Sequence, residues 1–88
     1  MKRYKALIKD VFSGPIAALR KKRGLTQEEM AEQLRITSRA YGDLERGTYC
    51  LSAVTLLFFL LMLEDEERKG LLEEFRKRVL ALEQKEAA

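Results

Sequence analysis

The stretch Ser52–Leu63, SAVTLLFFLLML, constrains this chain most strongly, because apart from Ser52 and Thr55 it is wholly apolar. As a helix, Ala53–Leu63 would be about 16 Å long, whereas the hydrocarbon layer of a bilayer is about 30 Å thick. We therefore expect no membrane span here. A helix that is apolar on every side must be buried on every side, so the fold has to supply more than one cover for it.

The length and the residue types limit what else the chain can be. With 88 residues it forms a single domain, 1–88, with one modest core. It has one cysteine and no histidine, so the commonest general base is missing and a zinc site has too few ligands. No phosphate loop or nucleophile–base pair is present. We expect no enzyme activity, no catalytic residue, no cofactor and no metal, and a cytoplasmic location.

Charge is distributed unevenly along the chain. The first 23 residues contain eight Lys and Arg against Asp10 alone, while the net charge of the whole chain is only +3. A basic segment indicates an anionic partner such as nucleic acid, although a solvated helix surface would have the same composition.

Apolar residues recur at helical spacing along the whole chain, which predicts an all-α fold. Residues 1–13 are expected to form an N-terminal helix or a basic arm, which Ser13-Gly14-Pro15 separates from the next helix. Residues 15–63 then form a core of short helices, and residues 65–85 form a C-terminal helix.

Capping residues mark the short helices. Thr26 and Glu29 form a capping box before a helix over 27–34. Thr37 can cap a second helix that ends near Arg46, with Gly47 following it, and Ser52 can cap the apolar stretch. Two helices of about eight residues joined by a short turn predict a sharp crossing that presents the second helix outward.

These features resemble the helix-turn-helix domain of the lambda/434 repressor-like family, also called Cro/C1 or XRE, over residues 16–63. The matching features are Leu19-Arg20, GLTQEE, Met30-Ala31, Leu34, Thr37, Tyr41 and Leu44-Glu45-Arg46-Gly47. The resemblance implies a five-helix DNA-binding domain, to which this chain adds an N-terminal helix and an extended C-terminal helix.

The resemblance also implies roles for individual residues. Base-edge contacts in the major groove fall to Ser38, Arg39 and Asp43, and phosphate contacts to Gln27, Arg35, Arg46 and Thr48. Arg20 and Glu45 match a partly buried ion pair that orients the reading helix. Ser38 and Asp43 are also compatible with plain surface residues. One departure is the loop Thr48–Leu51, which carries no charge where the family often places basic residues.

The apolar stretch has a core side and an outer side on a helical wheel. The predicted core side is Ala53, Leu56, Leu57, Phe59, Leu60 and Leu63; the outer side is Val54, Phe58, Leu61 and Met62. The cover is either another part of this chain or a second copy, which would form a homodimer. The predicted dimer interface is the outer side together with Leu72, Phe75, Val79 and Leu82 of the C-terminal helix.

Taken with the resemblance, these patterns predict a sequence-specific regulator of transcription that binds double-stranded DNA. It would be a repressor that binds a near-palindromic operator as a dimer. The alternative is a helix-turn-helix module for protein contacts, such as an antitoxin or an adaptor subunit.

Overall fold

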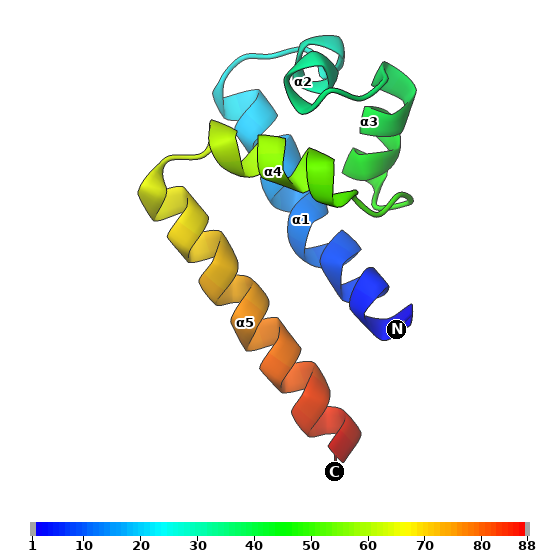
Figure 1. Ribbon diagram of the computed structural model, residues 1–88, viewed down its shortest axis with the longest axis vertical. Coiled ribbons are helices and arrows are strands. Elements are labelled where there is room, and N and C mark those ends of the chain that lie inside the picture. The colour runs from blue at the N-terminus through cyan, green and yellow to red at the C-terminus, as the bar shows by residue number, and fades with distance from the viewer. Residues whose placement is uncertain (1, 88) are drawn as a thin grey trace.

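The computed structural model describes residues 2–87, and between these residues it contains helices but no strand (Figure 1). The prediction of an all-α fold is therefore confirmed. The five helices are α1 (Lys2–Lys22), α2 (Gln27–Leu34), α3 (Ser38–Arg46), α4 (Ala53–Met62) and α5 (Asp65–Ala87).

The short helices begin at the predicted caps. At α2 both halves of the capping box are formed: the Glu29 amide donates to Thr26 Oγ1 over 3.1 Å, and the Thr26 amide donates to Glu29 Oε1 over 2.8 Å. Thr37 Oγ1 accepts from the Ala40 amide in the same way at α3. Gly47, with φ of 73°, ends α3 in the left-handed conformation that glycine adopts without steric cost.

The predicted break at Ser13-Gly14-Pro15 is wrong, because α1 continues through it. Pro15 has no amide hydrogen to donate to the Val11 carbonyl, which normally destabilises a helix interior. Here the buried stripe that includes Val11, Ile16 and Leu19 runs past the proline, while Pro15 itself faces solvent. Burial of one continuous apolar face therefore outweighs the local cost of the proline.

The N-terminus is a packed helix rather than a free basic arm. Its first turn is attached to the end of α5, where the Tyr4 hydroxyl donates to Glu83 Oε2 over 2.5 Å. Arg3 Nη1 lies 2.5 Å from Glu86 Oε1. Figure 1 shows α1 and α5 running side by side toward this end of the molecule. Residues 2–13 are therefore helical, but they form the first part of α1 and not the separate N-terminal helix that was predicted; residue 1 lies outside the described residues.

The C-terminal helix packs within the chain. Phe75 lies against Phe12 of α1, with ring centroids 6.0 Å apart, and Val79 and Leu82 also pack against the core. Leu71 is the buried residue at the start of this contact, whereas the predicted Leu72 is exposed. The buried face of α5 therefore begins at Leu71, one residue before the first α5 residue of the predicted interface.

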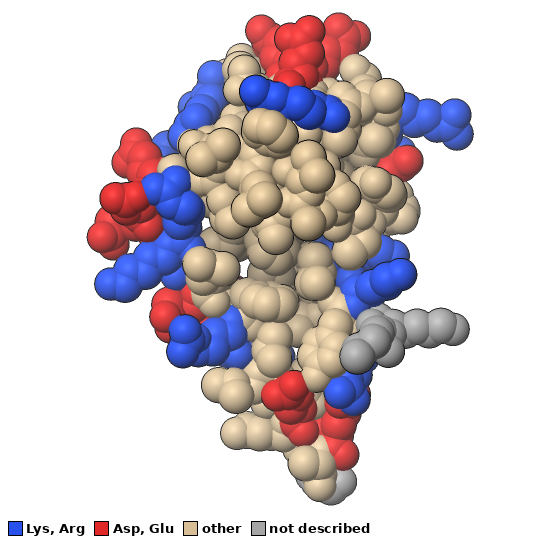
Figure 2. All heavy atoms as spheres, viewed as in Figure 1, with Lys and Arg blue, Asp and Glu red and all other residues tan. Residues whose placement is uncertain are grey.

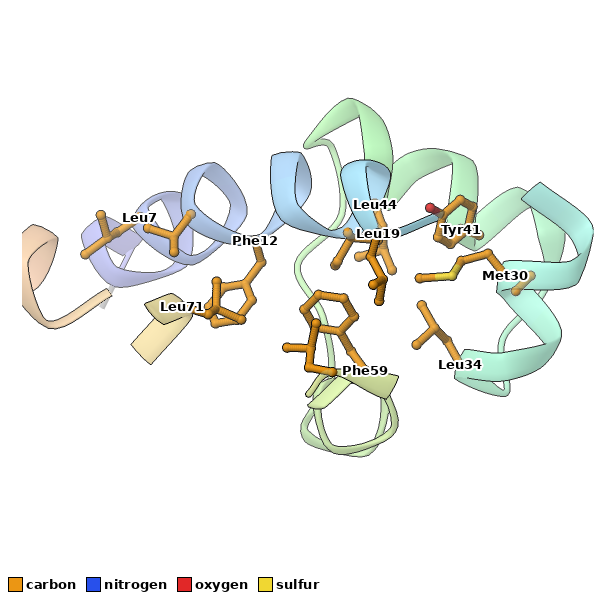
Figure 3. Close-up of a cluster of buried hydrophobic side chains, with 13 residues drawn as sticks. Leu7, Phe12, Leu19, Met30, Leu34, Tyr41, Leu44, Phe59 and Leu71 are labelled. Carbon is orange, nitrogen blue, oxygen red and sulfur yellow. The ribbon is translucent and has the colours of Figure 1, made fainter. Parts of the chain in front are cut away.

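The core lies where α1 crosses the other helices, and Figure 3 shows its side chains in two groups. The larger group joins α1 to the short helices and includes Leu19, Met30, Leu34, Tyr41, Leu44 and Phe59. The smaller joins α1 to α5 and includes Leu7, Phe12 and Leu71. All of these residues are buried.

Helix α4 is only half covered. Thr55, Phe59 and Leu63 face the core, as their spacing of four residues requires. Ala53 and Leu57 were predicted to face inward, and this is wrong: both are exposed, Leu57 by 61%. A helical wheel could not separate these positions because nearly every residue of the stretch is apolar.

None of the helices between residues 2 and 87 combines the length and the hydrophobicity needed to cross a membrane.

We expect Pro15→Ala to raise the free energy of unfolding by about 2–3 kcal/mol, because it restores an amide donor at an exposed position inside α1. Chemical denaturation monitored by circular dichroism would measure this change. Gly14→Ala is the matched control, with an expected gain of about 1 kcal/mol. A loss of stability in Pro15→Ala alone would mean that the packing of α1 against α5 requires the local geometry imposed by proline.

Candidate nucleic-acid interface

The turn between α2 and α3 is three residues long and sets the crossing of the two helices. Arg35 adopts the left-handed conformation, with φ of 59° and ψ of 40°. This conformation costs a non-glycine residue about 1–2 kcal/mol. Two hydrogen bonds close the turn over it, from the Arg35 amide to the Glu32 carbonyl and from the Ile36 amide to the Ala31 carbonyl. The chain therefore reverses sharply, and α3 begins directly after the turn.

Helix α3 has one buried side and one open side. Tyr41 and Leu44 are buried against the core, whereas Ser38 and Arg39 lie exposed in the first turn. Within residues 2–87, the Arg39 side chain makes no hydrogen bond and no ion pair. The donors of its guanidinium, near the start of α3, are therefore available to a ligand. A planar guanidinium can donate two hydrogen bonds to the edge of a guanine.

The second half of the open side carries an internal ion pair. Arg46 Nη2 bonds to Asp43 Oδ1 one turn away on the same helix. The Arg46 guanidinium lies over Gly42, where an added Cβ would come within 3.2 Å of Nη1. Gly42 therefore leaves room for this arginine to fold back along α3. The positive charge of Arg46 then lies next to the Asp43 carboxylate and offsets its negative charge.

A hydrogen-bond network around Glu45 joins the first three helices. Arg20 of α1 donates from Nε to Glu45 Oε2 over 2.6 Å and from Nη2 to Oε1 over 3.3 Å. Gln27, the first residue of α2, donates from Nε2 to Oε1 over 3.0 Å. The Tyr41 hydroxyl donates to Oε2. The structure thus brings Arg20 and Glu45 together as the resemblance implies, and adds Gln27 and Tyr41 to them.

This network sets the ionisation of its members. Burial raises the pKa of Glu45, but the hydrogen bonds from Arg20, Tyr41 and Gln27 lower it more, so the net pKa is below the usual 4.5. Burial raises the pKa of the Tyr41 phenol, and the bond to the Glu45 carboxylate raises it further. The side chains of Arg20 and Glu45 are only 16% and 12% exposed, so the carboxylate stays charged while screened from solvent.

The other predicted phosphate contacts occupy different places. Thr48 lies just beyond α3, and its Oγ1 donates to the Asp43 carbonyl over 3.2 Å, which satisfies one of the last carbonyls of the helix. Arg35 lies on the α4 side of the molecule, with its guanidinium carbon 4.0 Å from the centroid of the Phe58 ring. The structure therefore groups Ser38, Arg39, Asp43, Arg46 and Thr48 on or next to α3, and separates Arg35 from them.

Sequence reasoning missed the hydroxyl of Tyr41 and the amide of Gln27 as partners of Glu45. The spacing of Tyr41 from the apolar residues of α3 predicts that its ring lies in the core, and the ring is indeed buried. Its spacing of four residues from Glu45 was the available signal, because residues i and i+4 are neighbours on a helix. Gln27 gave no such signal, since its contact with Glu45 depends on the tertiary crossing of α2 and α3.

Comparison with known proteins identifies one related family. A family model described as Helix-turn-helix matches residues 16–60, just over half of the chain, from the second part of α1 into α4. No curated protein and no solved structure matches the chain significantly.

We expect Glu45→Gln to lower the free energy of unfolding at neutral pH by about 1–3 kcal/mol, because it leaves the partly buried Arg20 without a counter-charge. Urea denaturation would measure the change. Glu73→Gln, an exposed carboxylate on α5, is the matched control and should have no effect.

The same variant tests the pH dependence. Because the folded-state pKa of Glu45 is depressed, its contribution is fully present above the unfolded-state pKa near 4.5 and is lost as pH falls through the folded-state pKa. The difference in stability between wild type and Glu45→Gln should therefore shrink as the solution is acidified below pH 4.5. A constant difference would contradict this assignment.

Proposed function

Since the chain belongs to the helix-turn-helix family of DNA-binding regulators, of the Cro/C1 type, we propose that it binds double-stranded DNA at a specific sequence. The observation that carries the proposal is the capped first turn of α3, in which Ser38 and Arg39 are exposed while the other side of the helix is held by the Glu45 network. A reading helix must be fixed in orientation, because base contacts discriminate only when donors meet the base edge at the right angle.

In the proposed complex α3 lies in the major groove. Arg39 donates both sides of its guanidinium to a guanine, and Ser38 contacts a neighbouring base or the backbone. Asp43 accepts from a cytosine amino group only if Arg46 turns away to a phosphate, so this pair acts as one unit. An unpaired Asp43 would repel the backbone, and its ion pair with Arg46 in the free protein reduces that repulsion.

The proposed phosphate contacts are Gln27, Arg46 and Thr48. Gln27 is held at the start of α2 by Glu45, where the helix dipole also favours a phosphate. Arg35 is left out of this set, because its guanidinium stacks on Phe58 on the α4 side. Few cationic contacts mean low affinity for one protomer, since neutralised phosphates supply much of the binding free energy.

A homodimer would compensate for the low affinity of one protomer for DNA. The proposed interface is the apolar stripe of α4, formed by the exposed Val54, Leu57 and Leu61 together with the half-buried Phe58. Val54, Leu57 and Leu61 are 60%, 61% and 75% exposed. Their spacing of three and four residues places them on one side of the helix. In Figure 2 the surface over α4 consists of uncharged residues, with charged residues along its borders.

Burial of such side chains contributes about 1.5–3 kcal/mol each, which favours association. Met62, predicted in this interface, is half-buried at the edge of the stripe. The α5 residues Phe75, Val79 and Leu82 pack on α1 in the same chain, so the proposed interface does not use them. Two α3 helices related by a dyad would read half-sites about 34 Å apart, as in a near-palindrome.

A repressor is the simplest role for such a dimer, because occupation of a promoter excludes other proteins without any further activity. The second candidate is a module for protein contacts, such as an antitoxin or adaptor. The observation that favours it is the same α4 stripe, which lies beside Arg23 and Arg35 and would suit an acidic partner. Selection of bound fragments from random duplex DNA distinguishes the two, since an adaptor would enrich no sequence.

Once a site has been selected, Arg39→Ala should weaken specific binding by about 1–3 kcal/mol, because it removes a bidentate base contact. Fluorescence anisotropy with the selected duplex at fixed salt would measure this loss. Arg39→Lys should lose most of the same energy, since lysine keeps the charge but not the fork of donors.

Lys85→Ala serves as the control, because Lys85 lies exposed near the end of α5. It should bind the selected duplex like the wild type. Equal small effects from Arg39→Ala and Lys85→Ala would count against groove reading by α3.

The dimer is tested by Leu61→Glu, which should give a folded monomer. The side chain is 75% exposed in the protomer, so the charge is tolerated there but not in an apolar interface. Sedimentation would report the oligomeric state and circular dichroism the fold. Leu80→Glu, an exposed leucine on α5, should remain a dimer. A wild-type chain that sediments as a monomer at high concentration would rule out this interface.

A further inference from the structure

A cavity of about 390 Å³ lies between α1, α4 and α5, away from the open side of α3. Its lining is mainly apolar and includes Val11, Leu19, Phe59, Leu63 and Leu71. The cavity opens to solvent, and its volume is within the range of small-molecule sites. Two of the lining residues, Phe59 and Leu71, are labelled in Figure 3, where they belong to different groups of core side chains.

Small residues keep the cavity open to solvent. Gly70 of α5 lies on its wall, and a Cβ built on this glycine would meet no heavy atom within 4 Å. Pro15 and Ala18 line it on α1. Gly70 costs about 1 kcal/mol of helix propensity relative to alanine, and no close packing partner at this position requires it.

Three charged residues line the cavity, and two of them form an ion pair with each other. Lys22 Nζ lies 3.2 Å from Glu67 Oε2, and the other oxygen of Glu67 accepts from the Glu64 amide over 2.9 Å. Lys22 and Glu67 therefore satisfy each other. Between residues 2 and 87 the Glu74 carboxylate makes no hydrogen bond or ion pair, although it also lines the cavity. The group that remains available to a ligand is an anion.

We propose that this cavity binds a small aromatic or aliphatic molecule that carries one ammonium group. The apolar part of the ligand packs against Pro15, Leu63 and Leu71, and its ammonium group pairs with the exposed carboxylate of Glu74. Such a ligand contacts α1, α4 and α5 together, so it holds α5 against the remainder of the domain. The proposal is independent of DNA binding, and its test uses no nucleic acid.

Three probes of similar shape test the charge preference: phenethylamine, phenethyl alcohol and phenylacetate. Titrations are followed in amide proton–nitrogen correlation spectra of the full chain at neutral pH. We expect phenethylamine to shift amides of α1, α4 and α5 around the cavity and to bind about tenfold more tightly than phenylacetate, because opposite charges attract at a partly exposed site. Contacts between ring protons of the ligand and the side chains of Leu63 and Leu71 should appear in nuclear Overhauser spectra.

Two glycine variants give a matched pair. Gly70→Leu fills the mouth of the cavity and should abolish the shifts, while Gly14→Leu, at an exposed position in α1 with no heavy atom nearby, should bind as the wild type does. Both place a good helix former inside a helix, and circular dichroism checks that each is folded. Glu74→Gln should weaken phenethylamine binding severalfold and leave phenethyl alcohol binding unchanged.

Absence of binding by all three probes at millimolar concentration would overturn the site. Binding that survives in a folded Gly70→Leu variant would place the ligand elsewhere, with the same consequence. A preference for phenylacetate, or an equal effect of Glu74→Gln on amine and alcohol, would overturn the ligand class. If Gly70→Leu does not fold, the test is the presence of ligand contacts to Leu63 and Leu71 in the wild-type protein, and their absence is sufficient to reject the site.

Discussion

The Glu45 carboxylate is the interaction on which the arrangement of the first three helices depends. It lies near the end of α3 and accepts hydrogen bonds from Arg20 of α1, Gln27 of α2 and Tyr41 of α3 itself. Apolar contacts alone tolerate small rotations of one helix on another, whereas charge-assisted hydrogen bonds fix direction as well as distance. The network therefore orients α3 relative to the first residue of α2. In the proposed complex these two elements contact the same stretch of DNA.

The apolar helix α4 has one side in the core and one side in solvent. Phe59 and Leu63 complete the core, while Val54, Leu57 and Leu61 remain largely exposed. A domain of this size has few elements with which to cover a second apolar face, and α5 packs against α1 instead. The proposed dimer accounts for the unburied surface of α4, and it would offset the absence of charged residues in the loop 48–51. In that proposal, pairing would cover the apolar stripe and double the number of DNA contacts.

The pairing of α1 with α5 extends the domain beyond its helix-turn-helix part. Phe12 of α1 packs against Phe75 near the middle of α5. The hydrogen bond between Tyr4 and Glu83 joins the start of α1 to the end of α5. Nearer to α4 the two helices present Pro15 and Gly70, which are too small to fill the space between them. The cavity is thus a consequence of small residues on two long helices, and it lies where a ligand would contact α5 and the core at once.

The helix boundaries in the middle of the chain were determined by local sequence alone. Thr26, Thr37 and Gly47 act through hydrogen bonds and backbone angles within a few residues of themselves. The ends of these helices can therefore be predicted without knowledge of the tertiary structure. The positions of the candidate base contacts, Ser38 and Arg39, on α3 follow from the same local signals. The family resemblance, in turn, paired Arg20 with Glu45 across 25 residues of sequence.

Contacts between helices determined several features that local sequence could not predict. Pro15 continues a helix because the buried stripe of α1 extends on both sides of it. The exposure of Leu57, the burial of Leu71 in place of Leu72, and the stacking of Arg35 on Phe58 all depend on which helix lies opposite. A leucine has the same hydrophobicity on every side of a helix. Only the position of a neighbouring helix determines which of these leucines is removed from water, and that position is set by contacts between residues far apart in the chain.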